Sequence, residues 1–267
     1  MTRLTSLLAA ALLAAGSAAA QDSVPPHETF TLQSAALGET RRINVWTPPG
    51  YAAGRARYAV LYMPDGGVEE DFPHVVAAVD AAVRGGEMRP VIVAGIENTE
   101  RRRDMTGPTT VHRDSTIAPR VGGSAAFRRF IADELMPEVR RRYRVSDERA
   151  IIGESLAGLF IVETFFLQPE LFDTYIALSP SLWWNGGALV RAAPGYLRAR
   201  PGLRATLSLA SAGDDILEPI DAFADVLRAN APRGVRWTYE PRRDLTHATI
   251  YRGLEGRALR EALPPRR

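Results

Sequence analysis

Residues 149–158 read Arg149-Ala-Ile-Ile-Gly153-Glu-Ser155-Leu-Ala-Gly158 and join an apolar run directly to a helical period. Residues 150–152 are apolar at every position, which is typical of a strand buried on both faces. Helical spacing begins at Ala157, so Ser155 stands at the turn between strand and helix. A turn this sharp brings the helix back against the strand, and small residues such as Gly153 and Ala157 are needed on either side of the serine. The stretch predicts an exposed, nucleophilic serine.

The same alternation of strand and helix extends outward in both directions. Short apolar runs typical of buried strands occur at residues 58–63, 90–95, 149–153, 174–178 and 205–210. Helical periods lie at residues 72–83, 125–143, 157–168, 220–229 and 250–263. Residues 28–34 and 40–46 alternate around Gly38 as an antiparallel hairpin would. We therefore predict an α/β protein of the α/β-hydrolase fold, with a doubly wound, mostly parallel sheet and an antiparallel N-terminal hairpin.

The first twenty residues have the pattern of a cleavable signal peptide. A basic start at Arg3 leads into an apolar run, and small residues end at Ala20, where Ala18 and Ala20 satisfy the A-x-A rule. The run is shorter than a membrane span requires, and no later segment approaches that length. We expect residues 1–20 to be removed, residues 21–267 to form a single catalytic domain, and the protein to be periplasmic or secreted.

Composition excludes several classes of function. The chain has no cysteine, so it has no disulfide, thiolate metal site or thiol nucleophile. All 33 residues counted as lysine or arginine are arginine, which removes P-loop and Schiff-base chemistry because both require a lysine. A net charge of +2 gives no reason to expect a nucleic-acid partner. We expect no metal and no cofactor, and a small-molecule partner.

The serine needs a base and an acid that orients the base. His247 follows the last strand and precedes the final helix, which completes the order serine, acid, histidine. The acid is expected on the loop after the seventh strand, where Asp214, Asp215 and Glu218 are all candidates. Asp215 is our first choice among them, and a neighbour that is not the acid can cap a helix instead.

Two backbone amides are expected to bind the oxyanion. One belongs to Leu156, directly after the serine, and the other to Gly67 in the loop Pro64-Asp-Gly-Gly67, where glycines let a substrate approach the backbone. The alternative for this loop is a simple Asp-Gly turn. The stretch 98–123 is too long for an ordinary connection and is predicted to be a binding loop or lid.

A set of motifs carries a resemblance to a known family. They are Tyr62-Met-Pro-Asp-Gly-Gly67, Glu97-Asn-Thr-Glu-Arg-Arg-Arg-Asp104, Gly122-Gly-Ser-Ala-Ala-Phe127 leading to Asp133-Glu-Leu-Met-Pro137, Gly153-Glu-Ser-Leu-Ala-Gly-Leu-Phe160 and Ser179-Pro-Ser-Leu-Trp-Trp184. The chain resembles the putative-esterase family of α/β-hydrolases, which includes siderophore esterases acting on enterobactin, salmochelin and bacillibactin, and feruloyl-type esterases. The resemblance implies Ser155 as nucleophile, His247 as base, and the arginine-bearing loop as a wall of the substrate site.

Three further residues are candidates for substrate binding. Trp183 and Trp184 either stack on an aromatic acyl group or pack beneath the sheet edge. Arg103, in a run of three arginines, either binds an anionic or catecholate substrate or lies on a solvated loop. Two positions depart from the family pattern, because Glu154 replaces the usual histidine and Ala157 the usual glycine.

The prediction is a serine carboxylic-ester hydrolase that works through an acyl-enzyme. One alternative is an envelope acyltransferase with the same triad. The other is a non-catalytic envelope-binding module, which would have no need of the serine, the histidine and the acidic loop together.

Overall fold

A computed structural model describes residues 23–266, and the predicted signal peptide lies outside them. The strands form one eight-stranded sheet in the order β1-β2-β4-β3-β5-β6-β7-β8. Pairings β1–β2 and β2–β4 are antiparallel, and the others are parallel. The strands are β1 (Glu28–Ser34), β2 (Glu39–Trp46), β3 (Tyr58–Pro64), β4 (Val91–Ile96), β5 (Val145–Glu154), β6 (Thr174–Leu178), β7 (Ala205–Ala212) and β8 (Val235–Arg242).

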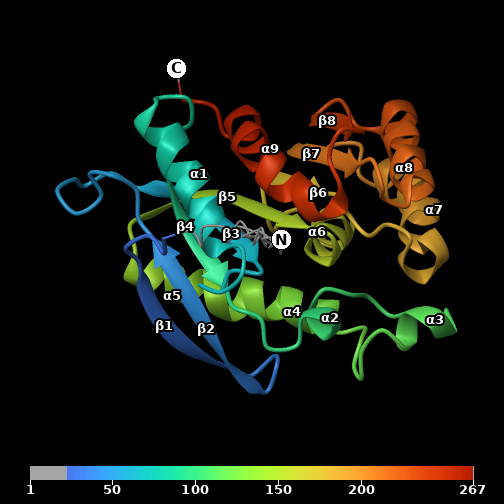
Figure 1. The fold of residues 1–267 in the computed structure, drawn as a ribbon, viewed down its shortest axis with the longest axis horizontal. Coiled ribbons are helices and arrows are strands. Elements are labelled where there is room, and N and C mark those ends of the chain that lie inside the picture. Colours follow the sequence, from blue (N-terminus) through green and yellow to red (C-terminus); the bar gives the residue numbers. More distant parts are fainter. Residues whose placement is uncertain (1–22, 267) are drawn as a thin grey trace, which may run out of the picture.

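Helices cover both faces of the sheet. Helices α1 (Phe72–Arg84) and α9 (His247–Ala262) lie together over one face, where they bury side chains such as Phe72 and Leu254 (Figure 1). The opposite face is covered by α4 (Ser124–Arg129), a π-helical turn (Phe130–Leu135), α5 (Met136–Arg142), α6 (Leu156–Leu167), α7 (Trp184–Arg198) and α8 (Leu217–Asn230). The central strands β3 to β6 are buried along their apolar runs and separate two apolar cores, as a doubly wound sheet requires.

The predicted fold class is confirmed, including the antiparallel N-terminal hairpin. The apolar runs fall on β3 to β7, and the single predicted helix 125–143 is divided by the π-helical turn. Apart from two short helices within the stretch 98–123, the elements that were not predicted are β8 and α7. Helix α7 is interrupted by left-handed backbone at Asn185, Gly186 and Gly187 and contains Pro194, so its sequence lacks a clean helical period.

The topology brings three distant loops to one edge of the sheet. Ser155 follows β5, Asp215 follows β7, and His247 follows β8, and these strands are mutually parallel within the sheet. The carboxyl ends of parallel strands open at the same edge, so the three side chains can meet there. The long stretch 98–123 contains the short helices α2 (Arg101–Asp104) and α3 (His112–Ser115). Within residues 23–266, no helix is long and apolar enough to span a bilayer.

Candidate active site

Ser155 is held in strained backbone between β5 and α6. Its φ of 59° lies in the left-handed region, which a residue with a side chain rarely adopts. Its amide donates to Leu178 of the neighbouring strand at 3.0 Å. A Cβ at Gly153 would stand 2.6 Å from the Cβ of Ala157, so only glycine allows the helix to approach the strand this closely. Local packing therefore fixes the direction of the serine hydroxyl.

His247 joins Ser155 to Asp215 through its two ring nitrogens. Nε2 lies 3.0 Å from Oγ of Ser155, and Nδ1 lies 2.7 Å from Oδ1 of Asp215. His247 is the first residue of α9, which begins with a capping box between Thr246 and Thr249. The cap fixes the start of the helix and with it the position of the imidazole.

Asp215 is positioned by donors from its own sheet edge. The amide of Ala212 donates to Oδ2 at 2.7 Å, and Ser179 also hydrogen-bonds to the carboxylate. Burial alone would raise the pKa of Asp215, but the bonds from His247, Ser179 and Ala212 outweigh it and lower that pKa. The hydrogen bond to Asp215 and the neighbouring carboxylate of Glu154 in turn raise the pKa of His247 to about 10, against the opposing effect of burial.

The other two candidate acids occupy different places. Oδ1 of Asp214 accepts a hydrogen bond of 2.6 Å from the backbone amide of His247, so this carboxylate caps α9. Glu218 is exposed in the first turn of α8. Of the three carboxylates, Asp215 is the one that meets the imidazole ring.

A second carboxylate also reaches the imidazole. Oε1 of Glu154 lies 3.0 Å from Nε2 of His247, the same nitrogen that faces Ser155. In the sequence, Glu154 stands out only as a departure from the family pattern. One signal for its role was present in the sequence. Glu154 directly precedes the nucleophile, so its side chain can reach a group that contacts Ser155.

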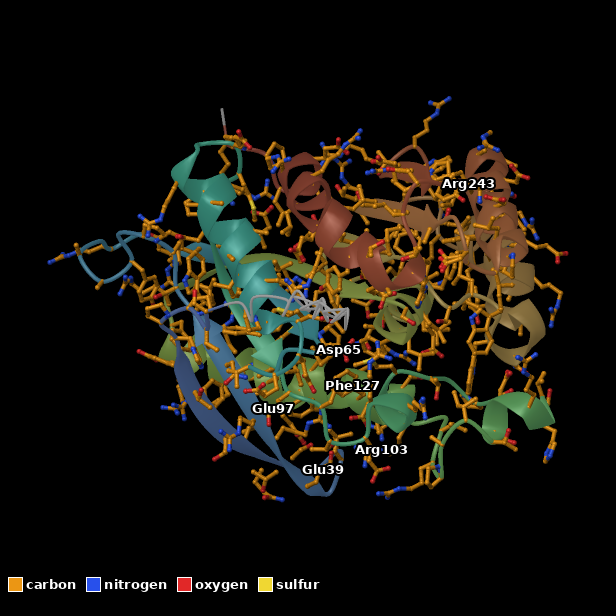
Figure 2. All side chains as sticks on the ribbon, viewed as in Figure 1. Glu39, Asp65, Glu97, Arg103, Phe127 and Arg243 are labelled. Atoms are coloured by element: carbon orange, nitrogen blue, oxygen red, sulfur yellow. The ribbon has the colours of Figure 1, made fainter. Side chains whose placement is uncertain are left out.

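An ion pair lies beside this group. Arg101 binds Asp65 through Nε at 2.6 Å and through a second nitrogen at 2.9 Å, and Asn98 donates to the same carboxylate. Arg101 also reaches the backbone carbonyl of Glu154 at 3.5 Å. Figure 2 labels Asp65 near the centre of the molecule. This pair ties the stretch 98–123 to the end of β3 and to the serine turn.

The two predicted oxyanion donors are placed differently. Leu156 begins α6, so its amide is among those that a helix leaves without an intrahelical partner. The amide of Gly67 instead donates to Oε2 of Glu70 at 2.7 Å. The Glu70 carboxylate must move before Gly67 can bind an oxyanion, and the role of Gly67 stays a prediction.

A cavity of about 590 Å³ opens beside α2, between the two ends of the stretch 98–123. It is lined by Glu100, Arg101, Arg102, Arg103, Ala118, Pro119 and Arg120. Four of these seven residues are arginines, so guanidinium groups dominate its wall. Arg101 connects it to the serine turn, because it contacts Glu154 as well.

The arginines of this cavity differ in how they are paired. Arg103 forms two hydrogen bonds to Glu39, at 2.7 and 3.0 Å, and a third to Asp104, and Figure 2 shows Glu39 and Arg103 on the same side of the molecule. Arg120 pairs with Glu100. Arg102 donates to the carbonyl of Ile117 and has no carboxylate partner within residues 23–266. The charge most available to a ligand is therefore that of Arg102 rather than that of Arg103.

The two tryptophans lie mainly against the protein. Trp184 is buried and its indole N–H donates to the carbonyl of Gly107 at 2.9 Å. Trp183 is half-buried, packs against the larger core and contacts Trp184 at a ring-centroid distance of 6.0 Å. Trp184 thus links α7 to the stretch 98–123, and of the two rings only Trp183 keeps substantial exposure.

Comparison with solved structures places this architecture among serine hydrolases of the α/β-hydrolase fold. The chain is similar to an IroE-like serine hydrolase from Shewanella oneidensis, with a TM-score of 0.79 and 25% identity, over 88% of this chain and 79% of that one. It shares the fold of the BES protein from Bacillus cereus, with a TM-score of 0.77 and 20% identity, over 89% and 96% of the two chains.

The family model described as "Putative esterase" matches residues 34–257. The chain belongs to this family. It is similar to the ferri-bacillibactin esterase BesA of Bacillus subtilis, at 34% identity over 61% of each chain. It is also similar to the siderophore enterobactin esterase of Emericella nidulans, at 31% identity over 57% of this chain and 55% of the relative. The match thus spans less than two thirds of the length of these relatives.

Proposed function

We propose that the protein is a serine carboxylic-ester hydrolase that works through an acyl-enzyme, with siderophore-type esters as its substrate class. The observation that carries the proposal is the hydrogen-bonded chain from Ser155 through His247 to Asp215. A serine hydroxyl is a poor nucleophile until a base takes its proton, and an acid on the far ring nitrogen holds the imidazole in the required tautomer.

In the proposed reaction, unprotonated Nε2 of His247 takes the proton of Ser155 while Oγ attacks the ester carbonyl. The Leu156 amide stabilises the oxyanion, and Asp215 stabilises the imidazolium. The C–O bond to the alcohol then breaks, and the alcohol leaves with the proton from Nε2. A water molecule, deprotonated by the same nitrogen, releases the acid and restores Ser155.

The substrate class rests on two separate supports. The similar proteins include esterases named for bacillibactin and enterobactin. The cavity beside α2 is lined mainly by arginines, of which Arg101 reaches the serine turn and Arg102 has no carboxylate partner within residues 23–266. Guanidinium groups bind anionic oxygens and stack on aromatic rings, which suits catecholate-bearing esters.

A hydrolysis panel tests both parts of the proposal. The wild type and Ser155→Ala are assayed on short p-nitrophenyl esters, a feruloyl ester and a tri-catecholate lactone. We expect the lactone to give the highest kcat/KM, and Ser155→Ala to lose about three orders of magnitude on every ester that the wild type cleaves. Equal activity of wild type and Ser155→Ala would overturn the hydrolase mechanism. Turnover of the p-nitrophenyl esters without turnover of the lactone would overturn only the substrate class.

A further inference from the structure

The carboxylate of Glu154 is enclosed next to the imidazole of His247. Its Oε1 is buried, and within residues 23–266 it has no aligned hydrogen-bond donor. Of the arginine and histidine nitrogens in residues 23–266, the one that lies within 4 Å of this oxygen is Nε2 of His247, at 3.0 Å. A buried carboxylate oxygen without a donor is costly unless a positive charge or a proton stands beside it.

This arrangement favours a proton on one of the two groups. If His247 were neutral with its proton on Nδ1, where Asp215 accepts it, the partly negative Nε2 would lie 3.0 Å from a charged carboxylate oxygen that has no donor of its own. Two negative centres at that distance repel each other. A proton on Nε2, or on Glu154, removes the repulsion. With the proton on Nε2, that nitrogen cannot accept the proton of Ser155.

We propose that Glu154 is a positioning residue that holds a proton at Nε2 of His247, so that activation of Ser155 depends on the release of that proton. The inference rests on the proposed function, because it concerns the same serine and histidine. The carboxylate of Glu154 keeps Nε2 of His247 protonated in acid and neutral solution. Once that proton has left, the same carboxylate makes Nε2 a stronger base.

Other charged groups act on the same pair from the surrounding elements. Burial is the largest influence on Glu154 and raises its pKa, and the charge of Asp71, before α1, acts in the same direction. The charge of Arg101 in α2 lowers that pKa. Asp215 of the β7–α8 loop favours protonated His247 most strongly. Tyr251 of α9 is buried, and the charges of Asp71 and Glu154 both act on it. Asp65 offsets the charge of Arg101 through its ion pair. Among these groups, only Glu154 and Asp215 pair with the imidazole ring itself.

The first test is the pH dependence of kcat/KM on a p-nitrophenyl ester for the wild type and Glu154→Gln. We expect the acid limb of the variant to move to lower pH by about one unit or more, so that its activity on that limb is about tenfold higher. At high pH we expect the wild type to be the faster enzyme, because its base is stronger. The two profiles should cross. Glu154→Asp keeps the charge but is shorter, and its acid limb should fall between the other two.

A matched control is Glu218→Gln, which makes the same chemical change on an exposed residue of α8. Its profile should coincide with that of the wild type. A profile of Glu154→Gln that also coincides with the wild type would overturn the inference.

A second measurement does not depend on activity. In proteins that carry Ser155→Ala, the titration of the His247 ring followed by NMR should have its midpoint lowered by about one unit or more when Glu154→Gln is added. An unchanged midpoint would overturn the role of Glu154. A lowered midpoint, combined with a wild type that cleaves no ester of the hydrolysis panel, would support that role and overturn the proposed function, so the two failures are distinguishable.

Discussion

Asp214 and His247 are joined by a hydrogen bond from the backbone amide of His247 to Oδ1 of Asp214, at 2.6 Å. The adjacent Asp215 meets the ring of the same histidine, at Nδ1. Two neighbouring carboxylates therefore serve one residue in different ways: one caps the helix that carries His247, and the other contacts its side chain.

This difference predicts unequal effects of two similar substitutions. Asp215→Asn should lower kcat by up to about four orders of magnitude, because the imidazole loses its tautomer control and its cation is not stabilised. Asp214→Asn should cost about 1 kcal/mol of stability as a lost cap, with kcat near that of the wild type. Steady-state kinetics and denaturant unfolding measure the two effects. A larger loss of kcat in Asp214→Asn than in Asp215→Asn would show that Asp214, and not Asp215, is the triad acid.

The arginine cavity predicts a substrate-dependent change. Arg102 has no carboxylate partner in the part of the chain that is described, so Arg102→Gln should raise KM for an anionic aromatic ester about tenfold, the effect of losing roughly 1.4 kcal/mol of binding. Hydrolysis of neutral p-nitrophenyl acetate should be unchanged. The matched variant Arg113→Gln, on an exposed residue of α3, should affect neither substrate. Equal KM values of Arg102→Gln and wild type for the anionic ester would contradict an electrostatic role for the cavity.

Metal removal provides another prediction. Residues 23–266 contain no group of three or more histidine, cysteine, aspartate or glutamate side chains arranged to hold a metal ion. Hydrolysis should therefore continue at the wild-type rate after prolonged dialysis against EDTA. Loss of activity that added zinc or calcium restores would show that a metal takes part in the reaction.

A buried histidine away from the active site predicts a pH-dependent stability. Nδ1 of His74 lies 2.5 Å from Glu255, and Nε2 lies 3.0 Å from Asp71. Burial opposes the charge, but the two carboxylates outweigh it and raise the pKa of His74 to about 9. A histidine pKa that is higher in the folded state gives stability that is complete below about pH 6.5 and is lost as the pH rises through 9.

His74→Gln should therefore destabilise the protein most in mildly acidic solution. We expect the difference in unfolding free energy from the wild type to be larger at pH 6 than at pH 9.5, by at most about 3 kcal/mol. Urea unfolding at the two pH values measures it. A difference that is the same at both would show that His74 is neutral in the folded protein.

The central part of the fold could be predicted because its strands are buried on both faces. Each of them is a short, continuous apolar run, and such runs have few alternatives. Strand β8 escaped prediction because it is only partly buried and contains charged residues and Pro241. Its hydrophobic signal is correspondingly weak, since the sheet rather than its own sequence stabilises it.

The candidate site could be predicted in part. Ser155 is marked by the small residues around it, and His247 by its place before the last helix. The choice between Asp214 and Asp215 stayed open because it depends on how one loop turns, and the sequence carries no periodicity there. The contacts of Glu154 with His247, and of Gly67 with Glu70, depend on side-chain positions that only the packed structure defines.

Covalent labelling shows whether Ser155 is the nucleophile. The protein is treated with a fluorophosphonate, and its intact mass and labelled peptide are measured by mass spectrometry. We expect one adduct per chain, on Ser155, at a rate that falls by orders of magnitude in His247→Gln because the base is lost. No label on the active wild-type enzyme, or a label on a different serine that persists in Ser155→Ala, would contradict this assignment.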